Sequence, residues 1–189
     1  INDNTTTTYI DNIADSSLQY IIADFRENDS FGKILIDDIR ILSCGVTNIF
    51  LGNYSGYKNT TGFNNLFLGT EAGYSNTTGF NNLFLGRETG YKNTDGFYNI
   101  FLGTEAGYSN TTGFYNIFLG RETGYKNTTG IYNLFLGTEA GYSNTTGGEN
   151  IFIGNYAGIG NTTGNCNLFL GNYSGYSNTT GGGNIFIGD

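Results

Sequence analysis

The side chains that most often carry out chemistry in proteins are scarce in this chain. Its 189 residues include no His and only two Cys, Cys44 and Cys166, which lie far apart in the sequence. A zinc cluster, a Cys–His or Ser–His couple and a paired redox cysteine motif all need those residue types at close spacing. We therefore expect no catalytic residue, no cofactor and no bound metal, and we predict that the protein is not an enzyme.

Acidic side chains recur at one position of a repeated segment. The column consists of Glu71, Glu88, Glu105, Glu122 and Glu139, and the bases Arg87, Lys92, Arg121 and Lys126 stand beside alternate members. Carboxylates about 5 Å apart repel one another, and the bases offset part of that repulsion. We interpret the column as a solvated, partly neutralised charge ladder. A column of divalent cations is the less favoured alternative, because calcium sites normally combine several oxygens per ion.

Asn-Thr-Thr segments form a third set of residues that could take part in chemistry. They have the Asn-x-Thr form of a glycosylation acceptor. The asparagines concerned are Asn59, Asn76, Asn110, Asn127, Asn144, Asn161 and Asn178. The same segments are also typical of turns in which the Asn side chain bonds its own backbone. Both interpretations stay open here, and the turn is favoured.

A 17-residue repeat positions all of these residues. From Val46 to the last residue the chain copies itself without an insertion, and three Gly columns run through the copies. Each copy has one short apolar run, such as Leu66–Leu68, between a Gly and an Asn-Thr-Thr-Gly turn, which leaves no room for a helix. A fixed period of this size is typical of stacked repeats. The sequence therefore predicts an all-β fold, a parallel β-solenoid (β-roll) of about nine 17-residue coils.

The expected coil is narrow and encloses a single layer of side chains. Coils stacked at about 4.8 Å give a rod roughly 40 Å long, without space for a substrate cavity. The Gly columns supply positive φ angles or close backbone approach at the corners. An Asn precedes every apolar run, as Asn65 and Asn82 do. We expect these side-chain amides to form a hydrogen-bonded ladder along the rod.

Each apolar run has two faces. Alternation along a strand sends Leu66 and Leu68 to one face and Phe67 to the other. One face fills the coil, and the other leaves an apolar stripe of about 400 Å², as large as a soluble monomer usually carries. We expect the Phe stripe to be buried against a partner, most simply another copy. The alternative is that the N-terminal segment or a neighbouring face folds over it.

The subunit interface predicted in this way is a single column with two flanking isoleucines. It comprises Phe50, Phe67, Phe84, Phe101, Phe118, Phe135, Phe152, Phe169, Phe186, Ile185 and Ile187. A second aromatic column begins at Tyr57 and Tyr74, and rings at the coil spacing stack on one another. We favour packing as its role over an aromatic platform for a cell-surface glycan.

The chain divides into two parts. Residues 1–45 lack the repeat, and we predict that they form a β-rich N-terminal cap or a strand-exchange arm, because an open solenoid end presents unpaired backbone groups. Residues 46–189 form the solenoid. The last repeat ends at Asp189 with its apolar run complete. We therefore expect either a fragment or an end that joins another copy head to tail into an open filament.

Charge and cysteine usage limit the partners. The net charge of −8 disfavours nucleic acid, and the chain has no apolar run long enough to span a membrane. In one straight rod Cys44 and Cys166 would lie roughly 30 Å apart, given the coil spacing, too far for a disulfide. An intersubunit disulfide outside the cell and two free thiols are equal alternatives. We expect an extracellular or cell-surface location.

The repeat also resembles known families. The unit at 64–79, Asn-Asn-Leu-Phe-Leu-Gly-Thr-Glu-Ala-Gly-Tyr-Ser-Asn-Thr-Thr-Gly, is similar to the head repeats of YadA-like trimeric autotransporter adhesins. It is closer still to 17-residue repeats of phage tail-fibre-like surface proteins. The resemblance covers residues 48–188 and implies a left-handed parallel β-roll, often trimeric, that serves as a stalk or an adhesive head. Where those families have a small Ala, this chain has Phe throughout.

Two functional hypotheses follow. The first is an extracellular structural fibre subunit that self-assembles head to tail and through the Phe stripe into a filament. The second is a trimeric adhesin or tail-fibre head that binds a cell surface or a glycan. In both hypotheses the principal partner is the chain itself.

Overall fold

The computed structural model describes residues 26–28, 33–35 and 47–188. The chain divides into two units, Ile1–Gly45 and Val46–Asp189. In the first unit, β1 (Arg26–Asn28) and β2 (Lys33–Leu35) pair antiparallel. The rest of that unit, including Cys44, lies outside the described residues, so the cap or strand-exchange arm over residues 1–45 stays a prediction.

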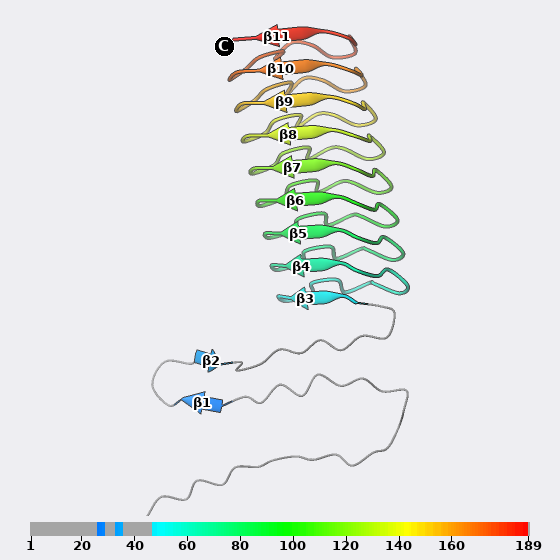
Figure 1. The fold of residues 1–189 in the computed structure, drawn as a ribbon, viewed down its shortest axis with the longest axis vertical. Coiled ribbons are helices and arrows are strands. Elements are labelled where there is room, and N and C mark those ends of the chain that lie inside the picture. The colour runs from blue at the N-terminus through cyan, green and yellow to red at the C-terminus, as the bar shows by residue number, and fades with distance from the viewer. Residues whose placement is uncertain (1–25, 29–32, 36–46, 189) are drawn as a thin grey trace, which may run out of the picture. The chain divides into compact units, whose positions relative to one another are not determined.

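The second unit is a parallel β-solenoid, as the repeat predicts (Figure 1). Its nine strands stack in chain order, and each residue pairs with the residue one repeat later, as Phe67 does with Phe84. The strands are β3 (Ile49–Leu51), β4 (Leu66–Leu68), β5 (Leu83–Leu85), β6 (Ile100–Leu102), β7 (Ile117–Leu119), β8 (Leu134–Leu136), β9 (Ile151–Ile153), β10 (Leu168–Leu170) and β11 (Ile185–Ile187). Each coil therefore contributes one three-residue strand to one continuous sheet, and the described residues contain no helix.

Backbone corners limit each strand to three residues. Gly120 follows β7 with a φ of 138°, and an added Cβ there would lie 2.5 Å from the carbonyl oxygen of Gly137. Left-handed backbone also occurs at non-glycine residues on both sides of the strand, at Tyr115 (φ 54°) and Glu122 (φ 53°). These conformations turn the chain out of the sheet direction at both ends of the strand.

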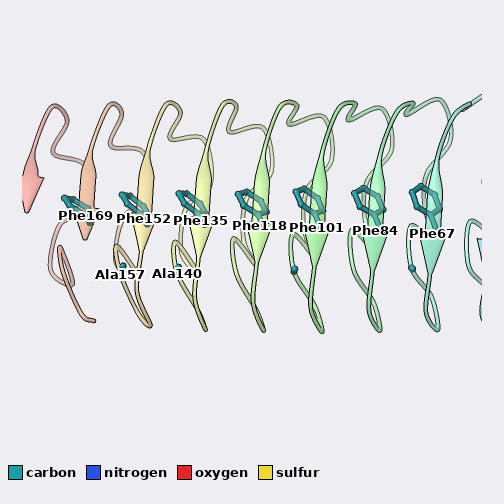
Figure 2. Close-up of a cluster of buried hydrophobic side chains, with 11 residues drawn as sticks. Phe67, Phe84, Phe101, Phe118, Phe135, Ala140, Phe152, Ala157 and Phe169 are labelled. Atoms are coloured by element: carbon teal, nitrogen blue, oxygen red, sulfur yellow. The ribbon is translucent and has the colours of Figure 1, made fainter. Parts of the chain in front are cut away.

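The Phe column lies inside the coil, which reverses the sequence-based assignment of the two strand faces (Figure 2). Phe67 and the equivalent residues up to Phe169 are 0% exposed. Their rings stack at centroid distances of 4.7–4.9 Å with interplanar angles of 3–8°. A Cβ on Gly73 would lie 2.4 Å from the Phe67 ring. The Gly in this corner of the coil therefore makes room for the ring.

Two asparagine ladders lie in the interior beside the Phe stack and a column of small buried residues such as Ala106 and Thr123. In the first, Asn116 donates to the carbonyl of Gly130 (2.8 Å) and accepts a hydrogen bond from the backbone of Asn133 (3.0 Å). In the second, Asn127 donates to Asn110 (2.8 Å) and to the carbonyl of Gly130. Every buried side-chain nitrogen and oxygen in the described part of the chain has a hydrogen-bond partner. The predicted amide ladder before the strands is therefore confirmed.

Candidate self-association surface

The outward face of the sheet is a continuous apolar surface, which we call the outer stripe. Its two columns flank the central Phe of every strand. The first column is Ile49, Leu66, Leu83, Ile100, Ile117, Leu134, Ile151, Leu168 and Ile185, and the second is Leu51, Leu68, Leu85, Leu102, Leu119, Leu136, Ile153, Leu170 and Ile187. Ile100 and Ile117 in the middle of the rod are both 37% exposed. An apolar stripe outside the coil therefore exists, as expected, but Leu and Ile form it.

The predicted interface residues divide accordingly. The side chains of Phe67 to Phe169 are fully buried and unable to touch a partner, so their assignment to a subunit interface is wrong. Phe50 is half-buried in the first coil, and Phe186 is 44% exposed in the last. Ile185 and Ile187, at 68% and 74% exposure, do belong to the outer stripe. The physical reason is the fit of stacked flat rings to the narrow coil interior.

Two further columns of residues flank the outer stripe at the corners of the coil, and we call them rims. The amino rim lies two residues before the first column of the outer stripe and consists of Asn64, Asn81, Tyr98, Tyr115, Tyr132, Glu149 and Cys166. Tyr98, Tyr115 and Tyr132 are 43–51% exposed. Their rings stack at 5.0 and 5.2 Å, with interplanar angles of 1° and 8°. The outer stripe is thus widened at mid-length by an exposed aromatic pile.

The carboxyl rim lies two residues after the second column. It consists of Thr70, Arg87, Thr104, Arg121, Thr138, Asn155 and Asn172. Arg121 is half-exposed and forms ion pairs with Glu122 of its own coil and, at 2.8 Å, with Glu139 of the next. Arg87 pairs with Glu88 and Glu105 in the same way. The glutamate column is therefore partly neutralised by Arg, as the sequence indicates.

A second tyrosine pile occupies a different corner of the coil. Rings from Tyr74 to Tyr142 stack at 4.9–5.1 Å, and Lys92 lies over the Tyr108 ring at 5.2 Å. Because neighbouring rings cover each other's faces, mainly ring edges remain for a ligand, and a sugar stacks on ring faces. Burial first, and then the Glu88 carboxylate of the preceding coil, raise the pKa of Tyr108. Tyr91, Tyr125 and Tyr142 have raised pKa values of similar origin.

The Asn-Thr-Thr asparagines point into the coil. Asn76, Asn110, Asn127, Asn144 and Asn161 are 0% exposed. The side-chain nitrogen of Asn127 makes two hydrogen bonds, and an attached sugar would disrupt them and find no space. Asn59 and Asn178, in the first and last coils, are half-buried and also donate to the Gly three residues on. This placement supports the turn interpretation and argues against glycosylation.

Cys166 lies on the amino rim and is exposed. Its Sγ lies 3.6 Å from Oε2 of Glu149, and this hydrogen bond raises the pKa of the thiol. A thiol held protonated is a weaker nucleophile. The proposed intersubunit disulfide also needs Cys44, which lies outside the described residues, so that pairing stays a prediction.

Three comparisons with known proteins found no match for the chain. No protein-family model, no curated protein and no solved structure matches it. In the part of the chain that the structure describes, no helix is long and apolar enough to cross a membrane, and no cluster of metal-ligating side chains occurs. The outer stripe with its two rims is therefore the candidate functional site on physical grounds alone.

Proposed function

We propose that the protein is a structural subunit of an extracellular fibre, and that copies of it associate through the outer stripe. The observation that carries this proposal is the nine-coil apolar face, built from residues that contribute little to the coil interior. A stripe about 40 Å long and 10 Å wide exposes about 400 Å², which is at the upper range for a soluble monomer. Selection for a lone soluble rod would favour polar residues at these positions.

The repeat supports growth along the rod as well. Every coil presents to the next the same donors, acceptors and rings, such as the Asn ladder and the Phe stack. The contacts that stack coils within one chain are therefore the contacts that would join two copies end to end. Heterologous contacts of this kind generate open filaments.

An adhesive head is the second candidate function. The resemblance of the repeat to YadA-like and tail-fibre-like repeats favours it, because those proteins are often trimers that bind a cell surface. Three rods around one axis would also cover part of the outer stripe. A closed trimer that does not grow with concentration would favour this function over a fibre.

The test introduces charge into the outer stripe. We would compare the full chain with an Ile117→Lys/Leu119→Lys variant by sedimentation velocity over a range of concentrations and by electron microscopy. The full chain is expected to form paired or longer rods. The variant is expected to associate at least tenfold more weakly, because lysines at one level of two copies repel and lose hydration on burial.

The matched control carries the same charges elsewhere. Thr112 and Thr129 are exposed in the Asn-Thr-Thr-Gly bends, and a Thr112→Lys/Thr129→Lys variant should assemble like the unmodified chain. Circular dichroism checks that both variants remain folded. A full chain that stays at the mass of a single copy at all concentrations would overturn the proposal.

A further inference from the structure

We infer that the outer stripe pairs with the outer stripe of a second copy whose rod runs in the same direction and in register, around a two-fold axis parallel to the rods. This inference rests on the proposed function, since it specifies the partner and the geometry of the same surface. Three features support it. The outer stripe is flat, the stripe and its rims together have the area of a stable interface, and Arg121 would lie opposite Tyr115 of the second copy.

The outer stripe is flat and straight. Successive Phe rings inside the coil deviate from parallel by only 3–8°, and Tyr98 and Tyr115 on the amino rim by 1°. Neighbouring coils are therefore related almost purely by translation, which gives the even stack of Figure 1. Rows of side chains follow one another at the strand spacing of about 4.8 Å. A second copy offers the same row spacing along its whole length, which an unrelated globular surface does not.

The area of the stripe with its rims suits a stable pair. Four outward positions span each coil, from Tyr115 through Ile117 and Leu119 to Arg121. At about 6.6 Å between alternate residues, the surface is roughly 20 Å wide and 40 Å long. That amounts to about 800 Å² per copy, the size of a standard specific interface. The apolar centre, flanked by exposed Tyr and Arg, also has the composition of interface hot spots.

The direction of the partner decides which rims meet. With both rods pointing the same way, a two-fold axis along them places the amino rim of one copy opposite the carboxyl rim of the other, at the same level. At β7 this puts Arg121 opposite Tyr115 of the second copy, twice per pair. The guanidinium edges of Arg121 already bind Glu122 and Glu139. Both faces of the Tyr115 ring are covered by Tyr98 and Tyr132, so the remaining N–H groups of Arg121 would donate to the hydroxyl at the ring edge.

The opposite direction brings like charges together. In an antiparallel pair each rim meets its own equivalent, and β7 is the middle strand of the nine. Full overlap then places Arg121 against Arg121 of the second copy, where like charges repel. In the parallel pair the charged Glu149 meets the neutral Asn155, and Arg87 meets Asn81. Charge complementarity therefore favours the parallel, in-register arrangement.

The first experiment measures affinity in the full chain. Arg121→Gln should weaken the pair about five- to thirtyfold, since two hydrogen bonds from the guanidinium groups to Tyr115 hydroxyls are lost. Arg87→Gln is the matched control, because it removes equivalent ion pairs but faces Asn81, and it should leave the affinity unchanged. Tighter association of Arg121→Gln would indicate antiparallel rods and overturn the inference. An equal effect of the two substitutions would also overturn it.

The second experiment tests the register by cross-linking. Both native cysteines are replaced by Ser, and chains carrying Tyr115→Cys are mixed with chains carrying Arg121→Cys. A bismaleimide that spans about 10 Å, the distance between packed sheets, should join only unlike chains. Cross-links between two Tyr115→Cys chains, a trimeric mass, or a dimer without cross-links would each overturn the parallel pair while leaving self-association intact. A chain that never associates would overturn the proposed function too.

Discussion

The two faces of one strand have separate tasks in this protein. Phe118 and Ile117 are neighbours in β7, yet the first is fully buried within its own coil and the second is more than a third exposed. The inner face is closed within the chain, because each ring contacts the rings of the coils before and after it. The outer face has no such closure in the described solenoid. The comparison teaches that folding depends on the inner face and that association depends on the outer one.

The largest expected effect comes from the inner face. Phe118→Ala removes a ring from the middle of the stack and leaves a cavity, so it should lower the free energy of unfolding by about 3–5 kcal/mol. Ile117→Ala, one residue away, should cost only about 1–2 kcal/mol in the single rod, because more than a third of this side chain is already exposed to water. Urea unfolding followed by circular dichroism, at a concentration where the chain is a single rod, measures both. Equal losses of unfolding free energy in the two variants would contradict the separate roles of the two strand faces.

A smaller loss is expected from the polar part of the interior. Asn116→Ala leaves the Asn133 backbone N–H without its partner, whereas the Gly130 carbonyl keeps its hydrogen bond from Asn127. A buried polar group without a partner costs about 1–3 kcal/mol, so the unfolding free energy should fall by about that amount. Asn53→Ala, at an exposed position, serves as control and should change it by no more than about 0.5 kcal/mol. A loss as small as that of the control would show that the ladder contributes no stability.

The smallest expected effect depends on pH and concerns the partly buried tyrosine pile. Burial and nearby carboxylates raise the pKa of Tyr91, Tyr108, Tyr125 and Tyr142 in the folded chain. The unfolded chain, with tyrosines at about pKa 10, loses these protons first. The contribution of these tyrosines to the free energy of unfolding is therefore fully present below about pH 10, and it is lost as the pH rises further.

Urea midpoints measured between pH 8 and 11 test this dependence. Tyr125→Phe keeps the ring in the pile and removes its titrating hydroxyl, so the variant should lose less stability across the alkaline range. Tyr115 lies on the exposed amino rim, outside this pile, and Tyr115→Phe is the control. If the Tyr125→Phe variant lost as much stability at alkaline pH as the unmodified chain, the pH dependence would not arise from this tyrosine pile.

Much of the fold could be predicted because the repeat specifies it. The 17-residue period, the single apolar run and the Gly columns determine a solenoid with one strand per coil, and the Asn before each strand predicts the interior ladder. Alternation also predicts two strand faces, but it does not say which face is inside. That choice depends on how flat Phe67 rings stack in a narrow coil against Gly73, which is a matter of packing in three dimensions.

One signal for the correct assignment was present in the repeat. The central position of the strand is Phe in every copy, whereas its neighbours exchange Leu for Ile, as at Leu83 and Ile100. A position that tolerates changes of shape is under weaker packing constraint. The two rims could not be predicted from the repeat alone. The position of Tyr98 depends on its left-handed backbone, and that of Arg121 depends on ion pairs that form only in the folded coil.

The spacing of the arginines limits how such a rod can change its length. Arg87 bridges Glu88 to Glu105, and Arg121 bridges Glu122 to Glu139, so each arginine serves the carboxylates of two successive coils. Excision of the coil between them would bring the two guanidinium groups to adjacent levels, about 5 Å apart. In this middle part of the rod, gain or loss of coils in pairs, in steps of 34 residues, would keep every arginine between two glutamates.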